Sequence, residues 1–397
     1  MPPKPSRPLL GWGRWLPAFA ALVVAQLLSG CCVEATVAAN VRPAGEAELA
    51  MWPPSTAVAA EASAAMTKGG ELSRDPTGGS GGKSKLLFTY ADGPEGFALA
   101  AALLSSPCLR QQLAGVVAAV ESPASHRATE LQRMGAEIRP MEPLQPQVFE
   151  GVEWAFVLAP LSADRLERGK VLLGAAWAAR VPQVMLLSVV GAEAGAAQPG
   201  STLEQYWALE QHLRLTWGSK GVVLRTFFYQ QNLAFWAGDV QASRGTLRLP
   251  LNSSGGFAPL HQWDVAATAA AIARHSVVPP QHAGRTFNLT GPQALSAQAL
   301  GDIASSTIGR HVDVKQASRE EAMALLQATG QLDRSEYELL LDLLELQPAL
   351  CSSGAALICP SPDMPSITGH AGTPVSRFFA ENAEIFQWQA RDEPSQR

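Results

Sequence analysis

From about residue 85 onward, the hydrophobic positions of this chain form short apolar runs that alternate with longer Ala-rich or amphipathic stretches. The apolar runs predict strands over Leu86–Thr89, Val116–Val120, Ala136–Arg139, Trp154–Ala159 and Gln183–Ser188. The stretches between them predict helices over Gly96–Leu104, His126–Met134 and Arg165–Arg180. This alternation is typical of β–α–β units that build one parallel sheet. We therefore predict an α/β fold with a doubly wound parallel sheet, whose ligand crevice lies at the carboxyl ends of the strands.

The turn after the first strand resembles a dinucleotide-binding turn whose chemistry is altered. In the pattern G-x-x-G-x-x-G, the glycines permit a tight bend, close approach to a pyrophosphate and close helix–strand packing. Gly93 and Gly96 hold the second and third positions, whereas Tyr90 holds the first. Asp92 and Glu95 place carboxylates where phosphates would lie. This glycine motif is therefore degenerate, and a weakened cofactor site is one interpretation of it.

A second interpretation of the same turn needs no ligand. Asp92 followed three residues later by Glu95 matches a capping box, and Pro94 suits the first turn of a helix. Two glycines at this spacing are a weak fingerprint when taken alone. Both interpretations therefore stay open at this point.

Composition and charge exclude some classes of function. The 397 residues are 47% hydrophobic and carry a net charge of -5, with no tract dense in Lys or Arg. This charge argues against nucleic acid as a partner. The cysteines and histidines lack metal-binding spacing, so we expect no metal. Whether Cys351 and Cys359 pair or remain thiols is left open.

The first 83 residues have a different character from the rest. Residues 1–32 carry basic residues without acids, followed by an apolar stretch of about 14 residues, which predicts a signal or targeting segment. Leu28–Cys31 resembles a lipoprotein processing box, which would place the protein at or across a membrane, whereas the arginine-bearing, acid-poor start would also suit import into a plastid-like organelle. Both locations stay open, and the cytosol is disfavoured. A buried N-terminal helix is the alternative. Residues 33–83 are rich in Ala, Gly and Ser and predict a disordered linker, leaving residues 84–390 as the folded domain.

Several separate stretches resemble one known family. They are Gly135–Ile138 with Glu142 beyond it, Phe149–Phe156, Val181–Ser188, Leu224–Asn232, Asp264–Ala266 with Thr286–Pro292, and Thr368–His370 leading to Phe378 and Phe379. In this order they are similar to motifs of the NmrA-like branch of the atypical short-chain dehydrogenase/reductases. The resemblance runs from Lys85 to Phe386.

The resemblance implies a Rossmann domain that binds NAD(P) and a smaller C-terminal α/β part that covers the crevice. Members of the family are either reductases of quinone-like, carbonyl or azo compounds, or non-catalytic sensors that report dinucleotide status to a protein partner. Carried over residue by residue, the cofactor-binding positions are Thr89, Gly93, Pro94, Glu95, Gly96, Glu121, Ala159 and Pro160. Glu121 stands where the family usually has an arginine for the 2′-phosphate, so we expect NAD to be favoured over NADP.

The residues expected at the catalytic centre depart from the usual dehydrogenase pattern. Tyr206 is followed four residues later by Glu210, where a Tyr-x-x-x-Lys pair would have lysine. A carboxylate there would raise the tyrosine pKa instead of lowering it, whereas direct hydride delivery to a quinone needs no tyrosine acid. Ser188 and Tyr206 are the candidate catalytic residues. Phe228, Tyr229 and Asn232 are the candidate substrate contacts, and Asp264 is expected to cap the helix that follows it.

The sequence thus predicts a diverged member of an NAD(P)-binding fold. Two hypotheses differ in whether it still binds the cofactor. The leading hypothesis is a reductase of quinone-like or other small aromatic substrates by direct hydride transfer. The alternative is a non-catalytic dinucleotide sensor or scaffold that has lost most of its cofactor affinity and acts on a regulatory protein partner. The N-terminal segment is expected to engage a membrane if it is not removed. The apolar stretch Tyr337–Leu350, together with Ala355–Ile358, is expected to form either a lid or a dimer face.

Overall fold

In a computed structural model, residues 83–388 are described, except 161, 198, 252–255, 331, 333 and 353–359. The expected targeting segment, most of the linker, and Cys359 lie outside the described residues. The main element is a seven-stranded parallel sheet in the order β3-β2-β1-β4-β5-β6-β8. Its strands are β1 (Lys85–Phe88), β2 (Gly115–Val120), β3 (Glu137–Pro140), β4 (Trp154–Val157), β5 (Gln183–Val189), β6 (Gly221–Thr226) and β8 (Thr286–Leu289).

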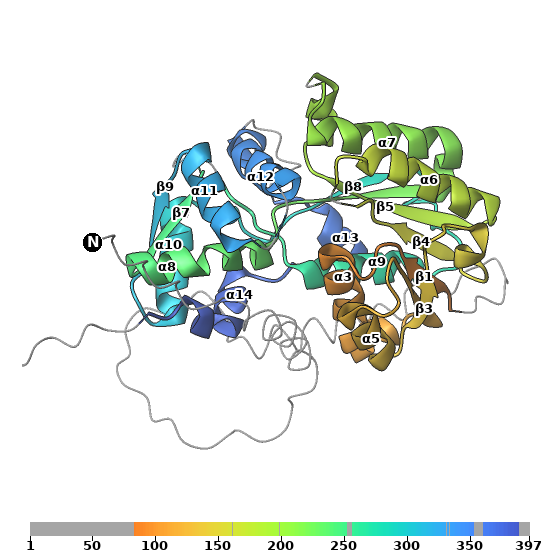
Figure 1. Cartoon of the computed structure of the whole chain (residues 1–397), viewed down its shortest axis with the longest axis horizontal. Helices are drawn as coiled ribbons and strands as arrows, with labels where there is room; N and C mark the ends of the chain where they lie inside the picture. The colour runs from red at the N-terminus through yellow and green to blue at the C-terminus, as the bar shows by residue number, and fades with distance from the viewer. Residues whose placement is uncertain are drawn as a thin grey trace, which may run out of the picture.

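Helices cover both faces of this sheet, as Figure 1 shows. One face carries α6 (Arg165–Ala178) and α7 (Thr202–Trp217). The other carries α3 (Pro94–Ser105), α4 (Pro107–Arg110), α5 (His126–Arg133), α9 (Gln262–Ala273) and α13 (Asp363–Thr368). Because both faces are covered, the central strands are buried along their length and consist of nearly continuous apolar residues. The order of the strands reverses between β1 and β4, so the ligand crevice of such a fold lies at their carboxyl ends.

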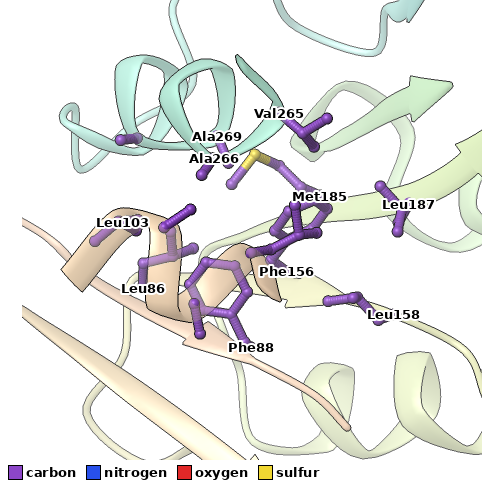
Figure 2. Close-up of a cluster of buried hydrophobic side chains, with 14 of the residues drawn as sticks. Leu86, Phe88, Leu103, Phe156, Leu158, Met185, Leu187, Val265, Ala266 and Ala269 are labelled. Atoms are coloured by element: carbon purple, nitrogen blue, oxygen red, sulfur yellow. The ribbon is translucent and has the colours of Figure 1, made fainter. Parts of the chain in front are cut away.

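The core between the sheet and α9 is built from aromatic and small side chains that interlock. Figure 2 shows Phe88, Phe156 and Met185 from neighbouring strands beneath Val265 and Ala266 of α9. The rings of Phe88 and Phe156 lie 5.5 Å apart between their centroids in a tilted arrangement. Alanines on α9 allow the helix to approach closely, which accounts for the Ala-rich sequence of this segment.

A smaller C-terminal part lies beside the carboxyl ends of the sheet, to the left in Figure 1. It holds a two-stranded parallel sheet of β7 (Thr246–Leu249) and β9 (Asp313–Gln316). Around it are η5 (Gln230–Trp236), α8 (Ala237–Ser243), α10 (Ala297–Ile308), α11 (Arg319–Thr329), α12 (Arg334–Ser352), α14 (Val375–Glu381) and η6 (Ala383–Phe386). These elements share a separate apolar core that includes Phe257 and Trp236. Across the described ranges, no helix has both the length and the apolar character needed to span a bilayer.

The predicted fold class is confirmed, and the predicted strands and helices match the observed ones closely. Two expectations about helix starts are wrong. Gly93, not Asp92, precedes α3 and makes no side-chain cap, although Pro94 does hold the first helical position. The side chain of His261, not of Asp264, caps α9 by accepting the Trp263 N–H at 3.1 Å.

The actual partners of the two aspartates explain these corrections. The Asp92 carboxylate accepts hydrogen bonds from the backbone N–H groups of Glu121 and Ser122 at 3.0 and 2.9 Å. The buried Asp264 accepts the backbone N–H and the hydroxyl of Thr373, both at 2.8 Å. Each aspartate therefore joins segments far apart in the chain, where a longer-range partner has replaced the local cap.

Candidate functional site

The turn between β1 and α3 keeps the close packing of a dinucleotide-binding turn. A Cβ added at Gly96 would lie 2.1 Å from the carbonyl oxygen of Tyr90 and 2.9 Å from Cα of Ala91, so only glycine fits there. Gly93 is less constrained, because its added Cβ would lie 3.1 Å from the same oxygen. Tyr90 itself has a φ of 49°, in the left-handed region that glycine usually occupies. The turn has thus kept a glycine backbone conformation at a position that now carries a tyrosine.

The Tyr90 side chain and three charged residues form what we call the outer cluster, at the carboxyl ends of β1 and β2. It consists of Tyr90, Arg168, Glu121 and Glu142. The Arg168 guanidinium lies 5.3 Å from the centroid of the Tyr90 ring and 3.2 Å from carboxylate oxygens of both Glu121 and Glu142. The tyrosine is 8% exposed, and burial raises the pKa of its hydroxyl to about 12. Glu121, the expected ribose contact, is therefore already engaged by an arginine.

A second group, the inner cluster, lies closer to the C-terminal part and consists of Glu95, Tyr229, Arg165 and Tyr206. The Tyr229 hydroxyl donates a hydrogen bond of 2.7 Å to the Glu95 carboxyl. The Arg165 guanidinium lies 4.8 Å from the centroid of the Tyr206 ring. Burial raises the pKa of Glu95, while Tyr229 and the charge of Arg165 partly oppose that shift. Burial also raises the pKa of Tyr206 to about 12.

The Glu95 pKa leads to a prediction about stability and pH. Because the folded-state pKa is raised above the unfolded value, folding favours the protonated acid, and stability is lost as pH rises through the folded pKa. We expect Glu95→Gln, which keeps an oxygen acceptor for Tyr229, to raise the free energy of unfolding at pH 8 by about 1 to 3 kcal/mol. The gain should shrink toward pH 5. Urea unfolding at both pH values measures it.

The matched control for this prediction is Glu150→Gln, a change at an exposed carboxylate. It should alter the free energy of unfolding by less than about 0.5 kcal/mol at either pH. A Glu95→Gln protein that is less stable than the parent at pH 8 would show that the Glu95 carboxylate stabilises the fold as a charged group.

Ser188, one of the two candidate catalytic residues, belongs to a buried ionic network. Its hydroxyl donates a 2.7 Å hydrogen bond to Glu210, which is fully buried. Arg225 donates to both oxygens of Glu210 at 2.8 Å, and Arg214 lies 3.3 Å away. Glu193 pairs with the outer side of Arg225. Glu210, at the position of the usual lysine, therefore has guanidinium partners and does not hydrogen-bond Tyr206.

The raised pKa of Tyr206 therefore has a different cause from the expected one. Burial is the main cause, and Glu95 and Glu336 add to it through their charges. Helix α12 contributes to this burial, since Leu339 and Leu343 pack with Tyr206 in one apolar cluster. The expectations of a lid and of a dimer face for the stretch 337–350 both stay predictions.

The other predicted site residues lie in more ordinary surroundings. Thr89 is buried and exchanges hydrogen bonds with the backbone of Leu158, at 2.8 and 2.9 Å. Ala159 packs in the same apolar cluster as Tyr90, with Pro160 beside it in the chain. Phe228 lies in the core of the C-terminal part, with its ring centroid 5.5 Å from that of Phe257. Asn232 is partly exposed.

Sequence reasoning missed Arg165 and Arg168, which face the two clusters. Both lie in the first turn of α6. A signal was present, since positive charge is unfavourable at the N-terminus of a helix, where the dipole is itself positive. Two arginines at that place call for carboxylates or anions as partners. Within the described parts of the chain, no group of three or more potential metal ligands comes together.

Comparisons with known proteins support the fold. No protein-family model matches the chain. The chain is 25% identical over 242 residues to an NAD(P)H azoreductase of Xenophilus azovorans, which covers 61% of this chain and 79% of the relative. The structure of the NADPH-dependent quinone oxidoreductase QOR2 of Escherichia coli matches with a TM-score of 0.57 at 21% identity, over 75% of this chain and 98% of that one.

NmrA, a negative transcriptional regulator whose structure was determined in complex with NAD, matches with a TM-score of 0.59 at 16% identity. The match covers 76% of this chain and 96% of NmrA. Both matches extend over about three quarters of this chain. The chain therefore has the fold of the NmrA-like branch of the atypical short-chain dehydrogenase/reductases, which confirms the resemblance seen in its sequence.

Proposed function

We propose that this protein is an NAD(P)H-binding reductase of quinone-like or other small aromatic compounds. The observation that carries the proposal is the retained turn at Gly96, where the approach of the Tyr90 carbonyl leaves no room for a side chain. The azoreductase relative and the quinone oxidoreductase of the same fold support the class of substrate. Their names describe flat aromatic or conjugated acceptors, for which the aromatic inner cluster is suitable.

The residues present fit the pyrophosphate half of a dinucleotide. The N-terminus of α3 lies at the retained turn, and a helix N-terminus stabilises phosphate charge. Arg165 adds a positive charge nearby, with two nitrogen atoms that lack hydrogen-bond partners among the described residues. Together they balance the carboxyl of Glu95, whose raised pKa already favours the neutral form.

The adenosine half fits less readily, because the outer cluster fills part of that end of the crevice. In this fold the residue at the end of the second strand contacts the ribose, and here Glu121 is paired with Arg168 over the Tyr90 ring. Binding would require this pair to open. A 2′-phosphate would meet Glu121 directly, so we infer a preference for NADH over NADPH.

A bound nicotinamide dinucleotide would supply the hydride. The residues of the chain position the acceptor and exclude water from it. Tyr206, protonated at neutral pH, offers a hydrogen-bond donor to the acceptor, and Leu339 and Leu343 of α12 shield that end of the crevice. Glu210 gives no help to Tyr206, because Arg225 and Ser188 occupy its oxygens. We therefore expect activity toward acceptors that take a hydride directly, such as quinones.

Titration of the full chain with NADH and NADPH, followed by addition of menadione, tests the proposal. We expect both nucleotides to bind, with NADH bound about tenfold more tightly, a difference of about 1.4 kcal/mol in binding free energy. We also expect menadione to cause oxidation of the bound NADH, followed as a loss of absorbance at 340 nm. The variant Glu121→Gln should reduce the difference in affinity between NADH and NADPH. Absence of binding at millimolar nucleotide would refute the proposal and leave the non-catalytic scaffold. Equal binding of the two nucleotides would refute the role of Glu121.

A further inference from the structure

Arg165 is a buried arginine whose hydrogen-bonding capacity is left unused. Arg165 is only 1% exposed, and its Nε and Nη2 atoms have no hydrogen-bond partner among the residues that the structure describes. The other buried arginine, Arg225, differs sharply, because Glu210 and Glu193 both pair with it. Arg168, one turn further along α6, pairs with two glutamates. Of these three arginines, Arg165 alone lacks carboxylate partners.

The position of Arg165 makes its charge costly to the folded protein. A buried charge without a paired partner loses its hydration and regains little. Arg165 is also the first residue of α6, where the helix dipole repels a positive charge. Stacking on the Tyr206 ring repays part of this cost. Among the described residues no carboxylate offsets the remaining cost, and function is a common reason for keeping a destabilising residue.

Four separate elements meet around this guanidinium. Tyr206 comes from α7 and Glu95 from the start of α3, while Glu336 of α12 and Arg165 of α6 both act on these two groups through their charges. Glu95 does not serve as the missing partner, because no ion pair within 4 Å joins it to Arg165 and its carboxyl is held by Tyr229. The Nε and Nη2 atoms of Arg165 therefore remain without an acceptor near the start of α3, where Glu95 lies close enough for the two charges to interact.

We propose that Arg165 and the N-terminus of α3 form an oxyanion-binding site at the inner end of the crevice. The planar guanidinium presents two free N–H directions, which suit a phosphate, sulfonate or carboxylate. The anion is either a phosphate of the dinucleotide or an acidic group on an aromatic ligand, whose ring would lie along Tyr206. The first source rests on the proposed function, whereas the second requires only that an aromatic acid binds.

Calorimetric titration of Arg165→Met in the full chain tests the site, with Lys170→Gln as the matched control. Lys170 lies on the exposed side of the same helix, paired with Glu167, so its loss removes one charge without touching the crevice. The probes are pyrophosphate, anthraquinone-2-sulfonate and the neutral 2-(hydroxymethyl)anthraquinone, each without nucleotide. We expect the parent and Lys170→Gln to bind at least one anion, and Arg165→Met to bind it at least tenfold more weakly. Binding of the neutral quinone should not change.

The two anion probes separate the two sources. Loss of pyrophosphate affinity alone assigns the site to the nucleotide, and loss of sulfonate affinity alone assigns it to the substrate. If NADH fails to bind but the sulfonate binds through Arg165, the oxyanion site stands and the proposed reductase function fails. If the parent binds neither anion, or if Arg165→Met binds both as tightly as the parent, the oxyanion site is refuted.

Thermal unfolding distinguishes binding from a structural role. Removal of an unsatisfied buried charge should leave the melting temperature of Arg165→Met unchanged or raised, while removal of a structural contact would lower it. A marked fall in the melting temperature together with unaltered anion affinity overturns the proposal. If Arg165→Met does not fold, Arg165→Lys replaces it. Lysine keeps the charge but loses the planar pair of donors, so a several-fold weaker anion affinity is expected, and unaltered affinity overturns the proposal.

Discussion

Replacing Glu210 with alanine is expected to lower the free energy of unfolding by about 3 to 5 kcal/mol, the typical cost of removing one partner from a buried ion pair. Glu210 accepts hydrogen bonds from Arg225 through both carboxylate oxygens and from Ser188. It is fully buried, so water cannot replace these contacts. The alanine variant would leave the Arg225 guanidinium with only its outer partner, Glu193, and would leave the Ser188 hydroxyl without an acceptor.

Glu193 provides the matched control, since it pairs with the same arginine from the opposite side. Its side chain is 47% exposed, and exposed ion pairs contribute about 0 to 1 kcal/mol. Glu193→Ala should therefore cost no more than about 1 kcal/mol. Chemical unfolding of the full chain measures both variants. Similar losses for the two glutamates would show that the burial of Glu210 does not determine its contribution.

Gly96→Ala is expected to destabilise the protein by about 1 to 3 kcal/mol or more, the cost of forcing an extra methyl into a packed interior. The new Cβ would lie 2.1 Å from the Tyr90 oxygen and 2.8 Å from the Tyr90 carbonyl carbon. These are backbone atoms of the turn that follows β1, so no flexible side chain can move away. The helix α3 or the turn must shift, and nucleotide binding should weaken with it.

Gly174→Ala is the matched control for this substitution. Gly174 lies in the interior of α6, and an added Cβ there would have no atom within 4 Å. Alanine is the better helix former, so this variant should be stabilised by about 0.5 to 1 kcal/mol. Thermal and urea unfolding compare the two. If Gly96→Ala were as stable as the parent, the close packing of the turn would be excluded as a reason for glycine at that position.

Much of the main sheet could be predicted because its strands are buried on both faces. Strands of this kind consist of consecutive apolar residues, as β1, β4 and β5 do in this sequence. The small strands β7 and β9 carry no comparable signal. In β7 the buried positions alternate with partly exposed ones, and β9 has no buried residue. Their pairing depends on the whole C-terminal part, which local patterns do not report.

The candidate site was predicted less completely, since long-range partners decide what each group does. Asp92 was expected to cap its own helix but binds the backbone beyond β2 instead. The substitution of Glu210 for lysine was seen in the sequence, whereas the pairing with Arg225 fifteen residues later could not be. Arg165 gave only the weak signal of a cation at a helix start. Which carboxylates meet which arginines depends on how the helices pack.

The path of the chain between the two parts of the molecule limits how the crevice can open. The chain enters the C-terminal part after β6, returns to the main sheet for α9 and β8, leaves again for α10 to α12, and comes back for α13 before ending in α14 and η6. A hinge motion between the two parts would need backbone changes in each of these connections at once. Bending of the whole molecule is therefore restricted. We propose that a ligand instead enters by local displacement of α12, which packs against Tyr206 of α7. A cross-link between α12 and α7 is then expected to slow nucleotide binding, measured by stopped-flow fluorescence, without altering the fold.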